Sequence, residues 1–189
     1  MKPRIILQSI AVILLAAVVL SAKDKNDEKR DKTHKMAAQT LQDLYKLQPT
    51  AQAAVQKAAG YAVFDNRNVN LLVVSTASGG GIAVNSSSKE ETFMKMASAG
   101  VGLGLGAKDY RVVFVFENDK ALGQFINSGW AADAQTDAAA KTETGGAAYS
   151  GAVQAAPGVW VYQITKKGLA LQLTLQGTKY YKDDELNKK

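Results

Sequence analysis

The residue types that most often carry out chemistry are sparse in this 189-residue chain. Cysteine is absent, which excludes disulfides, thiolate metal sites and cysteine nucleophiles, and the one histidine, His34, lies in a polar segment where we expect it to be solvated. The carboxylate pairs Asp133/Asp137 and Asp183/Asp184 are more typical of a solvated surface than of an acid–base pair. Neither a Gly-x-Ser-x-Gly elbow nor a Gly-Lys-Ser/Thr phosphate loop occurs. The sequence therefore predicts a protein that is not an enzyme and that holds no cofactor or metal ion.

Glycine occupies every second position from 100 to 106, in the order Gly100-Val-Gly102-Leu-Gly104-Leu-Gly106. Successive side chains of a strand point to opposite faces, so one face of this segment would be bare backbone. Such glycines usually mark the close approach of another backbone or of a ligand, and both interpretations stay open here. A valine at Gly102 or Gly104 should then overpack the contact and cost about 1–3 kcal/mol. A dinucleotide-binding loop is excluded, because a strand pattern rather than a helix follows at 111–116.

Several basic side chains lie where they could meet a lipid headgroup. They are placed at a predicted hairpin tip or strand end, and together with neighbouring tyrosines they form our candidate lipid-binding set: Lys166, Lys167, Lys179, Arg111, Tyr180 and Tyr181. A cation beside an aromatic ring suits the boundary of a membrane, although ordinary solubilising charges are the alternative. The polar aromatics could supply an amphipathic rim: Tyr110, Trp130, Tyr149, Trp160, Tyr162, Tyr180 and Tyr181. The formal charge of +6 is compatible with an anionic membrane surface, and no basic patch interleaved with aromatics indicates nucleic acid.

The N-terminal segment is typical of a secretory signal peptide. Lys2 and Arg4 precede an almost wholly apolar run over residues 5–20, and Ser21 and Ala22 supply small residues before a cleavage site. We expect cleavage after Ala22 and export to the periplasm or cell envelope, in association with membranes. An uncleaved anchor is the alternative, because about 18 apolar residues suffice for a marginal span. Residues 23–35 then form a polar linker or a frayed helix start.

Beyond residue 35 the hydrophobic spacing predicts helices followed by many strands. Apolar residues recur at helical spacing over 36–47, and Pro49 opens a second helix that ends before Gly60. From there the spacing changes to every second residue, with turns or breaks expected at 65–68, 78–81, 86–88 and 165–168. Asn118 is a predicted N-cap of a further helix, which stops at Gly129. Roughly eight candidate strands predict an α+β fold with a strongly bent, mostly antiparallel sheet or partly closed barrel and a few helices packed outside.

Taken together, these segments resemble the SYLF lipid-binding domain family, in its bacterial exported branch. The matching stretches follow one another along the chain at 60–64, 92–96, 100–106, 112–116, 121–125, 128–130, 166–169 and 176–181, and Asn187 comes after them. The resemblance covers about residues 36–187, which we predict to be one lipid-binding domain. It implies phospholipid binding without catalysis, with an anionic phospholipid or membrane surface as the partner. The alternative is a structural or protein-interaction module of the envelope, in which the same surfaces bind a protein.

Overall fold

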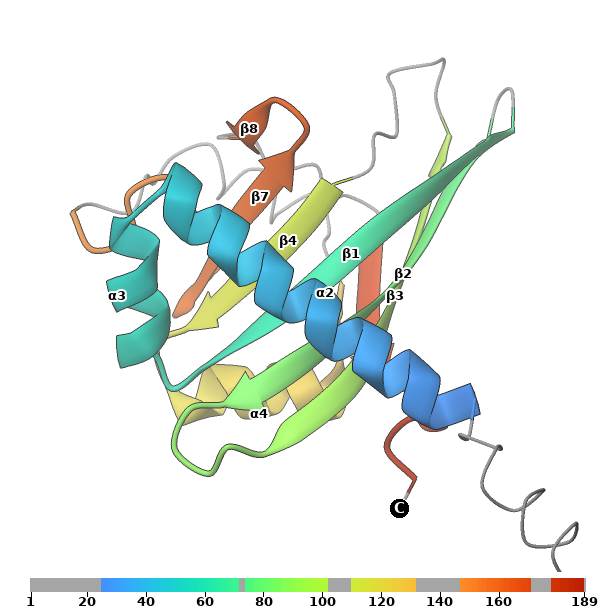
Figure 1. Ribbon diagram of the computed structural model, residues 1–189, viewed down its shortest axis with the longest axis horizontal. Coiled ribbons are helices and arrows are strands. Elements are labelled where there is room, and N and C mark those ends of the chain that lie inside the picture. The colour runs from blue at the N-terminus through green and yellow to red at the C-terminus, as the bar shows by residue number, and fades with distance from the viewer. Residues whose placement is uncertain (1–24, 72–73, 102–109, 132–146, 171–177, 189) are drawn as a thin grey trace, which may run out of the picture.

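Residues 25–71, 74–101, 110–131, 147–170 and 178–188 are described by the computed structural model of the chain (Figure 1). The helices in these residues are α2 (Lys25–Leu47), α3 (Thr50–Lys57) and α4 (Asp119–Ser128). The strands are β1 (Gly60–Leu71), β2 (Val74–Asn85), β3 (Glu91–Val101), β4 (Tyr110–Phe116), β5 (Trp130–Ala131), β6 (Val153–Ala156), β7 (Val159–Thr165), β8 (Gly168–Ala170) and β9 (Thr178–Lys182). They form one antiparallel sheet in the order β5-β9-β3-β2-β1-β4-β7-β6, with β8 paired to β7.

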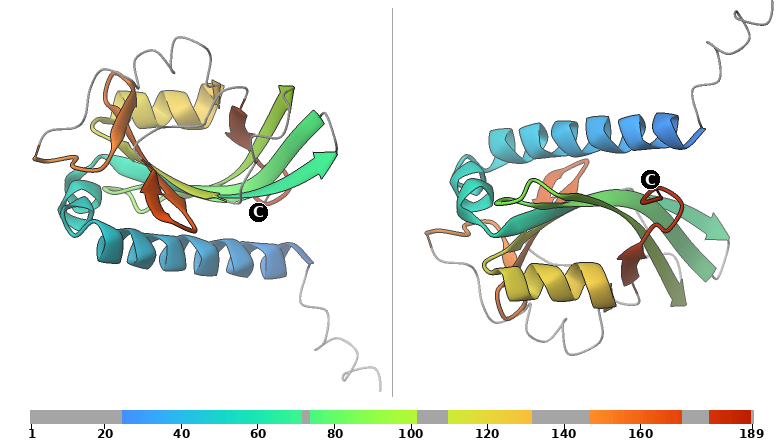
Figure 2. Two further views of the ribbon diagram at one scale, coloured as in Figure 1. Left: turned by 90° about the horizontal axis from the view of Figure 1, so that it is seen from above. Right: turned by 90° about the horizontal axis from the view of Figure 1, so that it is seen from below.

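The sheet is strongly curved, and helices cover both of its faces (Figure 2). The helix α4 lies within the concave face, whereas α2 and α3 lie against the convex face. The predicted α+β fold with a bent antiparallel sheet is therefore confirmed. Two helices pack outside the curve, and the third fills its inside, a position that hydrophobic spacing alone does not specify.

Each face of the sheet has its own hydrophobic core, because successive strand side chains alternate between faces. Phe64 of β1 and Phe114 of β4 point to the concave face, where their ring centroids lie 5.9 Å apart, and Phe125 of α4 packs 5.0 Å from Phe114. Their neighbours Val63 and Val113 pack on the convex face under the N-terminal helices. A sheet that is covered on both sides explains the unbroken apolar run of β4 at 112–116.

Residues 25–35, for which a linker and a helix start were both open, are helical and form the first half of α2. Charged side chains one turn apart support this part of the helix. Lys32 Nζ lies 2.6 Å from Glu28 Oε1, and Arg30 Nη1 lies 2.7 Å from Asp27 Oδ1. Among the helices in the described ranges, none has both the length and the apolar composition needed to cross a bilayer.

Polar contacts tie α2 to the convex face of the sheet. Arg111 Nη1 of β4 lies 2.9 Å from Asp43 Oδ2 of α2. His34 is exposed, as expected, and in addition its Nε2 lies 2.8 Å from Glu91 Oε2 and its ring packs 5.3 Å from that of Phe93. The helix continues past this residue and places the exposed ring beside the end of β3.

The hairpin of β1 and β2 is longer than predicted. A turn was expected at 65–68 and a break at 78–81, but pairing runs without interruption from Gly60↔Asn85 to Leu71↔Val74. Asp65 and Asn66 also pair with β4 on the other side of β1, so sheet context overrides the turn-forming composition. Glycine is required at Gly81, because an added Cβ would collide with the Phe64 ring and with the Val63 carbonyl oxygen.

Other sequence predictions are confirmed. Residues 86–88 form the turn within the 86–90 connection from β2 to β3, and residues 166–167 join β7 to β8. Asn118 caps α4, since its Oδ1 accepts a hydrogen bond from Ala121 N at 2.9 Å. Gly100 lies near the end of β3. The remaining members of the alternating series and one carboxylate pair lie outside the described residues: Gly102, Gly104, Gly106, Asp133 and Asp137.

The residues after β9, predicted to be a polar tail, are fastened to the domain. Arg30 of α2 donates from Nε to Leu186 O and from Nη2 to Lys188 O, both at 2.9 Å. Between these two residues, the Asn187 side chain accepts from Phe93 N at 2.9 Å and donates to Phe93 O at 2.7 Å. The Asn187 side chain thus pairs with the edge of β3 as a strand residue would, and the C-terminal segment contacts both β3 and α2.

Candidate functional site

The predicted lipid-binding lysines at the β7–β8 tip are exposed. Lys166 and Lys167 occupy the two positions between these strands. Lys166 and Arg111 also line a shallow hollow of about 170 Å³ together with Asp65. The structure therefore brings three of the four predicted cations, Lys166, Lys167 and Arg111, to one end of the β4–β7 pair.

Arg111 is partly buried and forms an ion pair with α2. Its guanidinium bonds Asp43 of α2 at 2.9 Å and lies 3.4 Å from Thr40 Oγ1. A hydrogen bond from Gln39 and the bond from Arg111 hold the pKa of Asp43 below its ordinary value. This ion pair docks α2 on the sheet, so Arg111 has a structural role that the sequence did not indicate.

The second predicted group lies on β9. Lys179 and Tyr181 are exposed and share one face of the strand, and 38 % of the Tyr181 surface is accessible. Tyr180 points to the other face, is 0 % exposed, and packs its ring 4.7 Å from that of Phe64. Burial raises the pKa of the Tyr180 hydroxyl well above its ordinary value. The placement of Tyr180 at a headgroup boundary is therefore corrected: it is a core residue of the concave face.

The two groups do not form one patch. The strands β3, β2, β1 and β4 lie between β9 and β7 in the sheet. Lys179 and the tip lysines Lys166 and Lys167 can therefore contact a membrane together only if the protein lies broadly on its surface.

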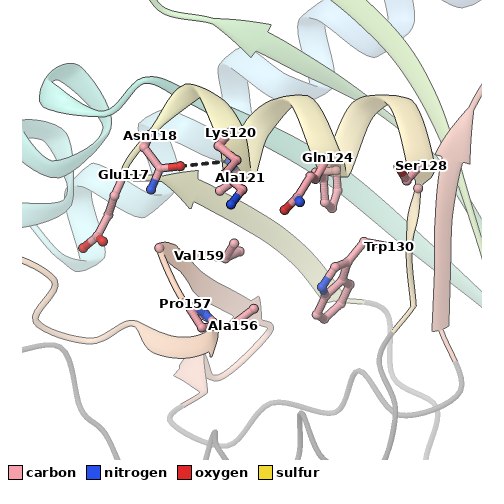
Figure 3. Close-up of a pocket in the computed structure, with 13 residues that line it drawn as sticks. Glu117, Asn118, Lys120, Ala121, Gln124, Ser128, Trp130, Ala156, Pro157 and Val159 are labelled. Atoms are coloured by element: carbon pink, nitrogen blue, oxygen red, sulfur yellow. Dashed lines mark hydrogen bonds between the residues drawn. The ribbon is translucent and has the colours of Figure 1, made fainter.

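A groove of about 670 Å³ opens between α4 and the turn that joins β6 to β7 (Figure 3). It lies where the two ends of the curved sheet, β5 and β6, approach α4 from opposite sides. The volume is within the range of about 300–1,000 Å³ typical of small-molecule sites. We regard this groove as the candidate functional site.

The wall formed by α4 is amphipathic along its length. Lys120, Gln124 and Ser128 recur every four residues and form a polar line on the helix. Ala121 and Phe125 lie beside this line and turn towards the core. A ten-residue helix gives this wall a length of about 15 Å.

The opposite wall is the β6–β7 turn, which is held against the start of α4. Gly158 has a φ of 74°, and an added Cβ there would lie 2.8 Å from Asn118 Nδ2. The Gly158 carbonyl accepts a hydrogen bond from Glu117 N at 2.9 Å. Ala156 and Pro157 of the same turn give the groove apolar lining (Figure 3). The width of the groove is therefore fixed by the contact of this turn with α4.

Trp130 closes the far part of the groove. It is the first residue of β5, and its ring packs 5.6 Å edge-on from Phe114 and 5.8 Å from Tyr180. The indole ring points into the groove, with its nitrogen on the side of Val159 (Figure 3). In the part of the chain that the structure describes, this nitrogen has no hydrogen-bond partner. Trp130 therefore offers a ligand an aromatic surface and one hydrogen-bond donor.

The groove lining includes one acidic and one basic side chain, Glu117 and Lys120, both at the N-terminal end of α4. The N-terminal end of α4 has two acidic residues, Glu117 and Asp119, against one basic residue, Lys120. Near its C-terminal end, Lys182 Nζ lies 3.0 Å from the neutral Asn127 Oδ1 and forms no ion pair within the described residues.

The concave face becomes polar and neutral beyond the aromatic core. Tyr110, Asn66 and Thr178 are buried there. Burial raises the pKa of Tyr110, while the neighbouring Thr178 and Asn66 side chains oppose the rise. Neither atom of the Asn66 amide completes a hydrogen bond of normal geometry. This layer is uncharged and continues the core without supplying an acid or a base.

The described residues around the groove can bind a ligand through apolar contacts and hydrogen bonds. Glu117 is the acidic side chain beside the groove wall, and its Oε1 already accepts a hydrogen bond from Trp160 Nε1 at 2.8 Å. Within the described ranges, no cluster of three or more His, Asp or Glu side chains could hold a metal ion. The groove can act through apolar contact, an indole donor and a nearby ammonium group.

Sequence reasoning found only one member of this site. Trp130 was among the polar aromatics proposed for a rim, whereas the walls at 117–129 and 156–159 were not assigned a role. The dipeptide Pro157-Gly158 signals a turn, but no local pattern states that this turn meets α4. The contact follows from the curvature of the whole sheet.

Comparison with known proteins places the groove inside a matched region. A family model described as "Las17-binding protein actin regulator" (Ysc84) matches residues 97–189, which include the entire groove lining. The chain is also similar to a protein of Aeromonas veronii named "Beta cell expansion factor A", with 37% identity over 161 residues. This alignment covers 84% of the chain and 59% of the relative. The chain thus spans well under two thirds of the length of that relative.

Proposed function

Because the chain belongs to the SYLF family, also called the Ysc84 family, we propose that it binds phospholipid and catalyses no reaction. The groove along α4 is the observation that carries the proposal. Its apolar lining with a few polar groups is typical of a ligand site, and the described side chains around it supply contacts rather than an acid–base pair.

The membrane surface that the protein meets is anionic in this proposal. Lys166, Lys167 and Lys179 are exposed in two separate places. Each lysine near an anionic surface contributes about 1 kcal/mol to binding. Tyr181 lies beside Lys179 and can place its ring among the headgroups.

Sedimentation with vesicles of anionic or zwitterionic phospholipid, at low and high salt, tests this function. Replacing Lys166, Lys167 and Lys179 together with glutamine should weaken binding to anionic vesicles by more than about tenfold, because about 3 kcal/mol of attraction is removed. Rising salt should have the same effect on the wild-type protein. Absence of binding to either type of vesicle would refute the function.

A matched variant controls for net charge. Lys35, Lys46 and Lys57 are exposed on α2 and α3, and their replacement with glutamine removes the same charge from another surface. This control should bind anionic vesicles nearly as well as the wild-type protein. Equal losses in both triple variants would mean that overall charge, rather than the predicted residues, drives binding.

The place of action in this proposal is the bacterial periplasm or cell envelope. The signal-peptide pattern of residues 1–22 supports it. The mass of the mature protein isolated from cells tests the proposal: removal of residues 1–22 is expected, and an intact Met1 would indicate an anchored protein instead.

A second candidate function is protein binding in the envelope. The matched family is described by its binding of Las17, and β6 pairs with β7 alone within the described residues. An unpaired strand edge can add an extended peptide as a further strand. This function gains support if the purified protein binds no vesicle but retains a defined protein partner from envelope extracts.

A further inference from the structure

We infer that the far end of the β1–β2 hairpin, formed by Leu71 and Val74, inserts into the membrane while neighbouring cations contact the lipid phosphates. The inference rests on the proposed phospholipid binding and names the part of the protein that enters the bilayer. It places the ends of the strands, rather than either face of the sheet, against the membrane.

The hairpin end projects from the domain and is apolar in sequence. Pairing between β1 and β2 ends at Leu71↔Val74. The paired strand ends extend beyond α4 and point away from α3 (Figure 1). The ends of hairpins that face water are usually rich in glycine, asparagine and aspartate, whereas this one closes with an aliphatic pair. Large apolar residues at a projecting position are suited to contact with a membrane or a protein.

The strands that lead to the hairpin end lose their charged residues on the way. In the direction of this end, Arg67 is the last charged residue of β1 and Lys95 is the last of β3. The strand between them, β2, has no charged residue at all. Charged residues make up 21% of the whole chain, so their absence from three neighbouring strand ends lowers the cost of removing this region from water.

A row of paired residues crosses four strands at the base of this uncharged region. It consists of Arg67 of β1, Ser78 of β2, Ala97 of β3 and Lys179 of β9. Lys179 is exposed there. The row therefore places cationic residues on both sides of the strands that form and support the hairpin end.

The turn between β7 and β8 reaches the same level on the other side of β1. The strands β1 and β7 run in the same direction, and pairing through β4 places Thr165, the last residue of β7, in the row of Asn66. The exposed Lys166 and Lys167 follow Thr165, as Arg67 follows Asn66. A membrane that meets this end of the sheet broadly can therefore contact both groups of predicted lysines.

The opposite end of the strands does not favour an anionic membrane. Acidic residues outnumber basic ones there, with Glu90, Glu91, Glu117 and Asp119 against Lys89 and Lys120. An anionic surface attracts the lysines at the hairpin side and is repelled by this acidic side. The charge distribution thus selects the orientation in which the hairpin end faces the lipid.

The length of the hairpin end matches the outer layer of a bilayer. Leu71 lies about 14 Å beyond Arg67 along the strand. The headgroup region on each side of the hydrocarbon core is about 5–8 Å thick, so with the cations at the phosphates Leu71 and Val74 reach the outermost hydrocarbon. Within the described residues, β4 pairs with β1 only as far as Asn66. Deeper entry is therefore unfavourable, because backbone groups without partners are costly in lipid.

A dye at a single cysteine tests the insertion, because the chain has no cysteine of its own. Val74→Cys, labelled with an environment-sensitive dye, should be quenched when the protein binds vesicles of phosphatidylglycerol and dibrominated phosphatidylcholine. Ser87→Cys is the matched control, because Ser87 is exposed past the other end of β2, roughly 35 Å away along the strand. Its dye should stay unquenched, since bromine atoms quench only at short range.

A second variant tests the same residues without a dye. Leu71→Gln combined with Val74→Thr should weaken binding to anionic vesicles at least about tenfold in high salt, where apolar insertion is the attraction that remains. Leu47→Gln is the matched control, because Leu47 is exposed at the end of α2, and it should bind as the wild-type protein does. Thermal unfolding reports whether the double variant is folded, and the dye result decides the question if it is not.

The outcomes separate this inference from the proposed function. Vesicle binding with no quenching of the dye at Val74→Cys, or with a folded double variant that binds like the wild-type protein, would overturn the insertion and leave surface binding in place. Equal quenching at Val74→Cys and Ser87→Cys would overturn the orientation. Binding to no vesicle would overturn both the inference and the proposed function, and would leave a protein as the partner of the hairpin end.

Discussion

Replacing Gly81 with alanine should destabilise the protein by about 3 kcal/mol, although alanine is ordinarily favoured over glycine inside a strand by roughly 0.5–1 kcal/mol. The added Cβ would lie 2.7 Å from Phe64 Cε1 and closer still to Phe64 Cδ1 and the Val63 carbonyl oxygen. Carbon atoms pack best at about 3.5–4.0 Å. Phe64 is 0 % exposed and its ring is enclosed by those of Phe114 and Tyr180, so it cannot move aside. The cost should therefore reach the upper end of the usual range for overpacking.

Gly80 provides the matched control, because an added Cβ there would have no atom within 4 Å. Gly80→Ala should be neutral or stabilising by up to about 1 kcal/mol, through the lower entropy of the unfolded chain. Urea and thermal unfolding measure both variants. A loss of 3 kcal/mol corresponds to a fall in Tm of about 6–12 °C for a domain of this size. If Gly81→Ala unfolds at the same temperature as Gly80→Ala, the aromatic core can rearrange and the reasoning is refuted.

Three further predictions concern individual polar groups. Asp43→Asn should lower the free energy of unfolding by less than about 1 kcal/mol at neutral pH, because Gln39 and Arg111 depress the pKa of the carboxyl. The stability that the Asp43 carboxylate contributes is present above its unfolded-state pKa and is lost as the pH falls through its folded-state pKa, so in urea unfolding the stabilities of variant and wild type should converge in acid. Asn118→Ala should cost about 1 kcal/mol in urea unfolding through loss of the α4 cap, and Asn118→Ser should restore most of it; equal losses would refute the capping role. Burial raises the pKa of Tyr162 to about 12, so the stability that depends on the neutral hydroxyl is complete below the ordinary pKa near 10 and declines as the pH rises towards 12. Tyr162→Phe, which also removes an unpaired buried hydroxyl, should raise the free energy of unfolding slightly at neutral pH and reduce its loss at alkaline pH. An unchanged dependence of stability on alkaline pH would contradict this.

The sequence predicted the type of most elements but misplaced two turns, and both errors have the same cause. Residues 65–68 and 78–81 have compositions typical of turns, yet all of them are paired within the sheet: 78–81 with both β1 and β3, 65–66 with both β2 and β4, and 67–68 with β2. The alternating glycines at 100–106 were predicted to allow the close approach of another backbone or a ligand, and of these only Gly100 lies in a described strand. The same argument holds at Gly81, where Phe64 needs the space. Local composition indicates which backbone conformations a segment can adopt, and pairing with the neighbouring strands determines which one it adopts.

The candidate site was less predictable than the fold. Lys166 and Lys167 are exposed because a hairpin tip must be exposed, which the sequence shows directly. Tyr180 and Tyr181 are adjacent, and the sequence treated them alike, but alternation in β9 buries one and exposes the other. The groove joins residues around 120 to residues around 157, and this proximity depends on the curl of the sheet. A periodic pattern reveals faces of elements, whereas a groove is a property of how those elements meet.

The hydrogen bonds between Arg30 and the last described residues affect the point during synthesis at which the domain can fold. Arg30 is separated by more than 150 positions from its carbonyl partners at Leu186 and Lys188. The edge of β3 likewise stays unpaired until β9 has been synthesised. Contacts of such long range close last and slow folding. During synthesis the chain therefore cannot complete its domain until nearly the whole sequence is available. If the chain is exported as proposed, that delay keeps it extended for passage through a translocation channel.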